Sequence, residues 1–337
     1  AFALTESNVN NVFTTIKIIK KYNPQVTVCV FDSFATYNWE NILKDNPQID
    51  FIPYGSAYKT IFNVYMKIKC GHLLTSIDSE NLLTQNTSLT SEKHFAKSDF
   101  TDYIWADREN LNSRNVIIAH IISAYGCSSR CSFCTMPQMD NSISFRDIND
   151  VLNEIININT QYNIRFFHFN DPSFEGGGRF GKERMAHLCE LLISYPKKFG
   201  FRCFIRAGSF STTEDEKYLI LLKKAGFRNL FVGIESGSDF DLSLYNKRST
   251  VYNNEVFMNI CKKNGIEPFY GFVMLHPYST SETIKDNFKF LVKYSSSQLS
   301  HYINCLQIYS NTPIFKKITQ DGLLNYDYDY KILTRHK

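Results

Sequence analysis

The chain contains no apolar run long enough to form a membrane-spanning helix, which needs about 20 mainly apolar residues. It also contains no block of like charges, and its net charge of +4 is spread over scattered lysines. These two absences argue against a membrane span and against nucleic acid as a partner. The N-terminus, Ala1–Leu4, lacks the basic stretch of a signal peptide. It also lacks Met, so we expect the chain to begin inside a longer gene product.

Two patterns typical of structural zinc sites are missing as well. The chain has neither a second closely spaced cysteine pair nor a His-x3–5-His pattern. Most of the cysteines without motif spacing lie in apolar runs, where a free thiol behaves as a small hydrophobe. This usage fits a reducing, cytoplasmic location better than a disulfide framework. The cysteines concerned are Cys29, Cys70, Cys189, Cys203, Cys261 and Cys305.

The most informative feature that is present is a short loop with three cysteines. Cys127, Cys131 and Cys134 follow the spacing Cys-x3-Cys-x2-Cys, and the aromatic Phe133 precedes the last of them. Three thiolates this close can hold three irons of a cubane iron–sulfur cluster, which leaves one iron without a protein ligand. An open coordination position can bind a substrate or cofactor. There are two alternatives. The cysteines could be half of a zinc site with a His as the fourth ligand, or they could be a chance grouping.

Residues 116 to 318 alternate between strand-like and helix-like segments. For example, Ile148, Val151, Leu152 and Ile155 recur at helical spacing. Six strands that alternate with helices predict a parallel sheet with helical crossovers. The predicted strands are Val116–Ile122, Ile164–Phe169, Phe201–Arg206, Asn229–Ile234, Phe269–Leu275 and Tyr302–Ile308. Helices are expected near 148–156, 185–192, 213–222, 253–263 and 281–292, with a capping box at Thr213 and Glu216 and a stop at Gly226.

Polar residues stand where each predicted strand ends. Sites in parallel α/β folds form at the carboxyl ends of the strands, so these residues are candidates for one site. The first strand runs straight into the cysteine loop. The later strands end at Asn170 and Asp171, Arg206, Glu235 and Ser236, His276, and Tyr309, while Lys247 and Arg248 follow shortly after the fourth strand.

The first 105 residues predict part of an open doubly wound sheet. Strands are expected at Val26–Phe31 and Ile49–Ile52, and helices near 8–21, 37–46 and 57–69. The segment 78–110 is rich in Ser, Thr, Asn and charge, which is typical of a polar connector.

The cysteine loop and the strand-end residues resemble the radical S-adenosylmethionine (SAM) superfamily. The resemblance implies a (β/α)6 partial TIM-like barrel over 111–320, followed by an extension over 321–337. It implies that Cys127, Cys131 and Cys134 ligate a 4Fe–4S cluster, and that an electron donor such as flavodoxin or ferredoxin supplies it. SAM would be cleaved to a 5′-deoxyadenosyl radical that takes hydrogen from a small-molecule substrate. The sequence carries no motif for a particular substrate.

The resemblance also implies roles for single residues, each with a structural alternative. Phe133 would pack on the adenine of SAM or cap the core. Asn170 and Asp171 would meet the SAM amino group, or serve as turn and cap residues. Glu235, beside Ser236, would hold the ribose hydroxyls or form an ion pair. Arg206 and Arg248 would bind the SAM carboxylate, for which guanidinium is well suited, or form salt bridges. His276 and Tyr309 would face substrate, although a hydrogen-bonded structural histidine is the alternative for His276.

Residues 1–77 resemble the later half of the cobalamin-binding domain that precedes many radical SAM cores. The run 46–55, Asn-Pro-Gln-Ile-Asp-Phe-Ile-Pro-Tyr-Gly, carries this resemblance. Family members have a Gly-Gly pair where this chain has Asp32 and Ser33, and Gly-Glu-x-Glu where it has Gly55 to Tyr58. Glycines let backbone approach a bound nucleotide tail closely. These departures favour radical chemistry without cobalamin, such as dehydration, epimerisation, oxidation or rearrangement. A cobalamin-dependent methyltransferase remains the alternative, as does a non-catalytic iron–sulfur or zinc protein.

One further loop stands out. Gly176–Gly178 follows the second strand, and we expect a flexible loop at the mouth of the barrel, with a phosphate cradle as the alternative.

Overall fold

The computed structural model describes residues 1–5, 7–53, 57–72, 82–87, 100, 103–106, 108, 116–136, 143–294 and 297–324. The chain forms two compact units. The first comprises 1–98, 133–140 and 307–337, and the second comprises 99–132 and 141–306. Most of the expected connector 78–110 and of the extension 321–337 lies outside the described residues, as does Gly55.

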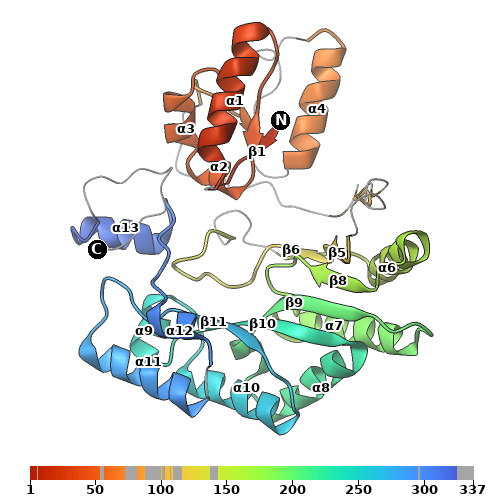
Figure 1. Cartoon of the computed structure of the whole chain (residues 1–337), viewed down its shortest axis with the longest axis vertical. Coiled ribbons are helices and arrows are strands. Elements are labelled where there is room, and N and C mark those ends of the chain that lie inside the picture. The colour runs from red at the N-terminus through yellow and green to blue at the C-terminus, as the bar shows by residue number, and fades with distance from the viewer. Residues whose placement is uncertain are drawn as a thin grey trace. The chain divides into compact units, whose positions relative to one another are not determined.

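The first unit contains short strands flanked by helices (Figure 1). Strand β1 (Phe2–Ala3) pairs in parallel with β2 (Val30–Phe31), and a parallel bridge from Cys29 to Phe51 continues the sheet. Next come β3 (Ile52–Pro53) and its antiparallel partner β4 (Leu82–Leu83). The helices are α1 (Val9–Tyr22), α2 (Ser33–Tyr37), α3 (Trp39–Asp45), α4 (Ala57–Lys69) and α13 (Pro313–Gln320).

Helices α1 and α4 lie where the sequence predicts them. The helix expected near 37–46 is confirmed as α3, while α2, which precedes it and meets it at Asn38, was not expected. Strands β1 and β4 were not expected, since two residues are too few to show a period-2 pattern.

The structure explains the Asp in the run 46–55. Asp50 Oδ2 accepts a hydrogen bond from the Val28 backbone N–H at 2.6 Å, and Lys20 Nζ lies 2.8 Å from the same oxygen. Asn46 is buried and donates to the Ile42 carbonyl at the end of α3. Both side chains therefore hold strand and helix ends together, and neither needs a ligand to satisfy it.

The second unit is built on a five-stranded parallel sheet in the order β11-β10-β9-β8-β5. Each strand neighbours the next one along the chain, which is the order of a barrel wall. The strands are β5 (Ile118–Ile121), β8 (Phe166–Phe169), β9 (Gly200–Arg206), β10 (Phe227–Glu235) and β11 (Phe269–Phe272).

The expected sixth strand, Tyr302–Ile308, is wrong in its first half. Residues Leu299–Ile303 form the short helix α12, and only the following segment runs beside the end of β11. There Leu306 N donates to the Leu275 carbonyl at 2.8 Å, and Cys305 forms an isolated parallel bridge with Leu275. A short apolar run cannot distinguish helix from strand by its spacing alone.

The helices of this unit cover one side of the sheet (Figure 1), and apolar side chains fill the space between. They are α6 (Ile148–Tyr162), α7 (Gly178–Ser194), α8 (Glu216–Ala225), α10 (Val251–Lys263) and α11 (Ser281–Lys293), with the short α9 (Asp239–Leu244) after β10. The capping box before α8 uses Thr212 and Asp215, one residue earlier than expected. Gly226 ends α8 with φ of 100°, as predicted. Within the described residues, no helix combines the length and apolarity that crossing a bilayer requires.

Candidate functional site

A short hairpin separates the first strand of the sheet from the cysteine loop. After β5, the chain forms β6 (Ala124–Tyr125), which pairs antiparallel with β7 (Ser144–Phe145). The prediction that the strand runs straight into the loop is therefore corrected. Cys127 and Cys131 follow β6, and Gly126 turns the chain with φ of 78°, a conformation that favours glycine.

Two buried arginines hold this hairpin in place. Arg146 is 2% exposed, donates to the Ile122 carbonyl, and pairs with Asp150 and Glu154. Arg184 donates to the Ser123 and Arg146 carbonyls at 2.8 and 2.9 Å. Burial lowers the pKa of Arg184 to about 10, so the guanidinium still carries its charge at neutral pH. The base of the cysteine loop is thus fixed by charge-assisted hydrogen bonds.

The loop itself is tied to the segment after α9. Ser132 donates from its backbone N–H to the Tyr245 carbonyl and from Oγ to the Leu244 carbonyl, both at 2.7 Å. Asn246 Nδ2 donates to the Arg130 carbonyl at 2.8 Å. These contacts join the cysteine loop to the segment that also carries Lys247.

The glycine-rich loop packs against the cysteine loop. A Cβ atom at Gly177 would lie 2.8 Å from Ser128 Oγ, which is too close for any larger residue. A Cβ at Gly176 would lie 2.6 Å from the Phe145 ring. The loop that we expected to be flexible is therefore tightly packed at Gly176 and Gly177, and it supports the cysteine loop. Helix α7 begins at Gly178, which provides the helix N-terminus that a phosphate cradle would need.

The cysteines differ in their surroundings. Cys131 is buried, and Cys127 Sγ accepts a weak hydrogen bond from Ser129 N–H at 3.4 Å. Burial raises the pKa of Cys131, while the positive charges of Lys247 and Arg206 act in the opposite direction. In the described part of the chain, no three His, Cys, Asp or Glu side chains converge on one point that could hold a metal ion. The donor set itself, three thiols with an N–H donor to sulfur and cations beside Cys131, fits an iron–sulfur cluster.

Glu235 forms an ion pair with Lys247 where β10 ends. Glu235 Oε1 lies 2.8 Å from Lys247 Nζ, and the side chains are only 15% and 7% exposed. Burial acts to lower the pKa of Lys247, but the charges of Glu235 and Cys131 outweigh it and raise that pKa. Glu235 adopts φ of 68°, a strained conformation for a non-glycine residue. A Cβ at Gly233 would lie 2.6 Å from both Glu235 Oε1 and Lys247 Nζ, so only glycine leaves room for the pair.

Arg206, at the end of the neighbouring strand β9, is incompletely satisfied. Its Nη2 makes one long contact, 3.4 Å to the Lys247 carbonyl, and its enclosed Nε has no hydrogen-bond partner among the described residues. Below it, the fully buried Glu175 accepts from Ser209 Oγ at 2.7 Å and from the Arg206 backbone N–H at 3.3 Å. Burial raises the pKa of Glu175. An enclosed guanidinium with an unused donor is suited to bind a carboxylate.

A buried polar network holds the loop that follows Glu235. Asp241 accepts from Ser236 Oγ, from Asn287 Nδ2 and from His276 Nε2, each at 2.9 Å. Asn287 Oδ1 also accepts from the Gly237 backbone N–H at 2.7 Å. Burial acts to raise the pKa of Asp241, but these hydrogen bonds outweigh it and lower that pKa. The network fixes the backbone on which Glu235 stands.

This network changes the expectation for Ser236 and His276. Ser236 is fully buried within it. His276 Nδ1 accepts from the Tyr278 backbone N–H at 3.2 Å, so both ring nitrogens are engaged and the side chain is fully enclosed. In this structure both side chains are enclosed in the network, so their predicted contacts with cofactor and substrate stay predictions.

Asp171 is also a supporting residue in this structure. It is fully buried, and its oxygens accept from the backbone N–H and the hydroxyl of Ser123. Burial raises the pKa of Asp171 to about 6, against the opposing hydrogen bonds from Ser123. Asn170, in contrast, is exposed, and its Oδ1 lies 2.9 Å from His120 Nδ1.

The other predicted residues are divided between the two units. Phe133, Cys134 and Tyr309 belong to the first unit, and Tyr309 donates to Gln307 Oε1 at 2.8 Å. Arg248 belongs to the second unit, but it is exposed and has φ of 52°. The second unit therefore gathers Cys131, Arg206, Glu235 and Lys247 near one edge of the sheet. Glu175 was not predicted, because only the fold places it under Arg206.

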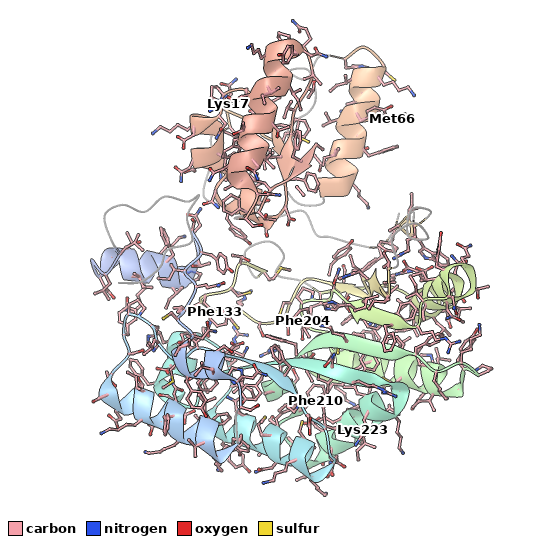
Figure 2. All side chains as sticks on the ribbon, in the orientation of Figure 1. Lys17, Met66, Phe133, Phe204, Phe210 and Lys223 are labelled. Atoms are coloured by element: carbon pink, nitrogen blue, oxygen red, sulfur yellow. The ribbon has the colours of Figure 1, made fainter. Side chains whose placement is uncertain are left out.

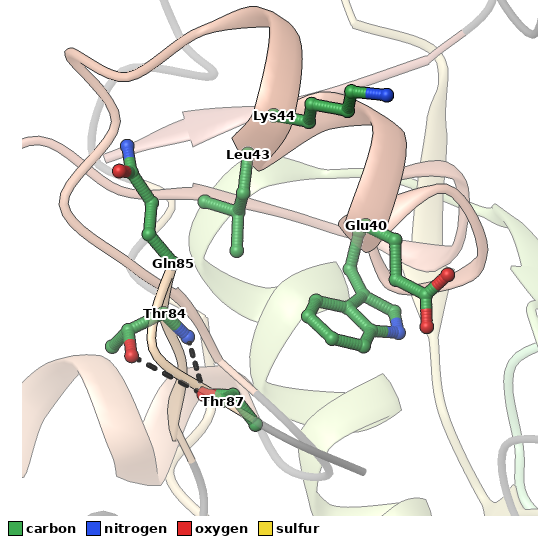
Figure 3. A pocket seen from close by; sticks show the side chains of 7 residues that line it. Glu40, Leu43, Lys44, Thr84, Gln85 and Thr87 are labelled. Carbon is green, nitrogen blue, oxygen red and sulfur yellow. Dashed lines mark hydrogen bonds between the residues drawn. The ribbon is translucent and has the colours of Figure 1, made fainter.

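Within the described residues, the structure contains two cavities, one in each unit. One, of about 500 Å³, lies in the first unit between α3 and the segment after β4, and Trp39, Leu43 and Thr87 line it (Figure 3). The other, of about 670 Å³, lies by the start of β11 and includes Pro268 and Phe269. That cavity is at the amino end of the sheet, opposite the strand ends that carry the polar residues.

Comparison with known families decides what this edge belongs to. The model of the radical SAM superfamily matches residues 121–291, just over half of the chain. The chain belongs to the radical SAM superfamily. This family implies a 4Fe–4S cluster and SAM as cofactors, and it makes the chain part of an enzyme.

Among similar proteins, an anaerobic magnesium-protoporphyrin IX monomethyl ester cyclase of Rubrivivax gelatinosus is 24% identical over 82% of this chain and 50% of its own length. The cobalamin-dependent SAM radical enzyme OxsB, solved with aqua-cobalamin and SAM, has a TM-score of 0.76 and 17% identity, over 98% of this chain and 54% of that one. The radical SAM methyltransferase TsrM from Kitasatospora setae has a TM-score of 0.71 and 15% identity, over 94% of this chain and 61% of that one. The chain thus shares the fold of cobalamin-dependent radical SAM enzymes, and it spans about half the length of such relatives.

Proposed function

We propose that this radical SAM chain cleaves SAM to a 5′-deoxyadenosyl radical and abstracts hydrogen from a small-molecule substrate. Cys127, Cys131 and Cys134 would hold the cluster, which supplies the electron for cleavage when it is bound. The observation that carries the proposal is the grouping of Arg206, Glu235 and Lys247 beside Cys131 at two adjoining strand ends.

The residues at this edge match the groups that SAM presents. The Arg206 guanidinium has an enclosed Nε without a partner and can pair with a carboxylate. Glu235 is held by Lys247 and retains a second oxygen that can accept from ribose hydroxyls. The absence of a side chain at Gly233 leaves room beside both. Among the residues expected at the SAM amino group, exposed Asn170 remains the candidate, whereas Asp171 already binds Ser123.

The proposal is tested with protein reconstituted with iron and sulfide without oxygen, reduced, and supplied with SAM. We expect 5′-deoxyadenosine from the unchanged protein and none from Cys131→Ala. Cys305→Ala is the matched control, because Cys305 is exposed and has no motif spacing. Equal product from Cys131→Ala and the control would refute the assignment of Cys131.

A cobalamin-dependent reaction, such as methylation, is the second candidate, and one observation favours it. Asp32 has φ of 92°, which is a backbone conformation normally taken by glycine. The loop after β2 therefore keeps the backbone shape that a glycine would give, although its side chain caps α2 through Ser33 N–H. Stoichiometric cobalt in protein from cells grown with cobalamin supports this candidate, and protein without cobalt under those conditions refutes it.

A further inference from the structure

The face of the sheet that the helices leave uncovered carries a row of aromatic rings. His120 and His168 have ring centroids 5.1 Å apart, and His168 lies 5.4 Å from Phe204. Phe204 lies 5.3 Å from Phe231, which in turn lies 5.3 Å from Phe269. The five rings come from β5, β8, β9, β10 and β11, so the row crosses the whole sheet. We call these five residues the ring row.

The ring row is not part of the apolar core. On β9, Phe201, Cys203 and Ile205 are buried against the helices, while Arg202 is exposed and Phe204 is partly exposed. Phe269, the last ring of the row, is 47% exposed. Figure 2 shows Phe204 at the sheet and Phe210 among the helices. His120 and Phe269 are exposed and the other three rings are partly exposed, and a contiguous aromatic surface of this kind is typical of a binding site rather than of packing.

The charge on this face has one sign. Apart from Glu235, the five strands contain no acidic residue, and Glu235 is paired with Lys247. Arg202 is exposed beside His168 and makes no ion pair within the described residues. Burial, together with the nearby Arg202 and His120, lowers the pKa of His168, so its imidazole is largely uncharged at neutral pH. Arg202 is therefore the cation of this surface that stands away from the strand end, where Arg206 lies.

Two members of the ring row, Phe204 and Phe231, lie close to the edge where SAM is proposed to bind. Phe204 precedes Arg206 by two residues on the same face of β9, which corresponds to about 7 Å along a strand. Phe231 precedes Gly233 by two residues on β10 in the same way. A molecule that rests on these two rings therefore lies next to the strand ends where SAM is proposed to bind.

We propose that the ring row is the substrate platform of this enzyme, and that the substrate is a planar conjugated ring bearing an anionic group that Arg202 binds. This inference rests on the proposed function. Stacking on Phe204 and Phe231 would orient the ring plane, and the guanidinium of Arg202 would fix its direction by a charge-assisted hydrogen bond. His168 Nε2, which is enclosed without a hydrogen-bond partner among the described residues, is a further donor or acceptor on the platform.

The test measures binding of simple probes to the reconstituted protein by calorimetry. 1-Naphthoate has a planar ring and a carboxylate, 1-naphthamide lacks the charge, and cyclohexanecarboxylate lacks the planar ring. We expect 1-naphthoate to bind about tenfold more tightly than either of the others. Equal affinities for the three probes would overturn the inference.

Two variants and a control locate the binding site. Arg202→Gln is expected to abolish the preference for 1-naphthoate over 1-naphthamide, and Phe204→Leu to weaken both about fivefold. Lys224→Gln removes an exposed charge on α8, among the helices, and is expected to change neither affinity. Should Arg202→Gln and Phe204→Leu both bind like Lys224→Gln, the platform is not on this face. Arg202 is exposed, so its replacement leaves the fold intact even if Phe204→Leu does not.

Formation of 5′-deoxyadenosine by the unchanged protein is measured in parallel. Loss of SAM cleavage with retained discrimination among the probes would contradict the proposed function and leave the platform standing. SAM cleavage without discrimination would contradict only the platform.

Discussion

His276 Nε2 lies 2.9 Å from Asp241 Oδ1, and both side chains are completely enclosed behind the end of β10. This hydrogen bond connects the segment after β11 to α9, the helix that follows Glu235. His276 is thus a positioning residue for Glu235 in this structure, and it acts through Asp241 and Ser236.

Replacing His276 tests that role. His276→Ala leaves the buried Asp241 with one donor fewer, which we expect to lower the free energy of unfolding by about 2 kcal/mol. His276→Gln keeps a donor and should restore most of the stability. If positioning matters, the dissociation constant of SAM rises in His276→Ala and recovers in His276→Gln. Thermal unfolding and SAM binding are measured on the same samples. A stability loss without any change in SAM affinity would show that the network serves the fold alone.

The ion pair between Glu235 and Lys247 distinguishes a binding role from a structural one. Glu235→Gln leaves Lys247 buried without its counter-charge, so we expect a loss of about 3 kcal/mol in stability. The double variant Glu235→Gln/Lys247→Met removes both charges and should regain stability. If Glu235 binds the ribose of SAM, the double variant stays defective in 5′-deoxyadenosine formation. Full activity of a refolded double variant would show that Glu235 has only a structural role, as the partner of Lys247.

Gly233→Ala probes the room beside the same pair. The added Cβ would come within 2.6 Å of Glu235 Oε1 and Lys247 Nζ, so the pair must move apart. We expect SAM affinity to fall about tenfold, equivalent to about 1.4 kcal/mol. Gly271→Ala is a milder comparison on the adjacent strand, where the nearest atom, Phe231 Cζ, would lie 3.3 Å away. A SAM affinity for Gly233→Ala that equals the unchanged protein's would contradict the close approach proposed here.

The raised pKa of Asp171 predicts that the stability of the protein depends on pH. Its pKa is raised to about 6 by burial, so the folded state holds the proton at pH values where the unfolded chain, with an Asp pKa of about 4, has lost it. The contribution of Asp171 to stability is therefore present below about pH 4 and is lost as pH rises to about 6. Asp171→Asn cannot titrate and should remove this fall. Unfolding of both proteins between pH 4 and 7 checks it, and parallel curves would contradict the raised pKa.

The sequence identified the parallel sheet and its polar edge because these depend on local patterns. Apolar runs such as Ile164–Phe169 and helical spacing after Ile148 reflect burial directly. The sequence did not reveal α12, since the run from Tyr302 is too short to distinguish helix from strand. The hairpin of β6 and β7 was also missed, because strands of two residues leave no period to detect.

Within the site, strand ends were predictable but partners were not. Arg206 and Glu235 stand where expected, because the carboxyl end of a parallel strand is a local feature of the sequence. The burial of Asp171 and His276 depends on Ser123 and Asp241, which are 48 and 35 residues away along the chain. No local pattern encodes such pairings. The same holds for the ring row, whose members come from five different strands.

The central claim is a cluster with one iron open to SAM, held by Cys127, Cys131 and Cys134. The most direct measurement is electron paramagnetic resonance of the oxygen-free, reconstituted and reduced protein with and without SAM. We expect a 4Fe–4S signal that changes when SAM is added and that is lost in Cys131→Ala. A 4Fe–4S signal that SAM leaves unaltered, or a preparation that contains only zinc, would contradict it.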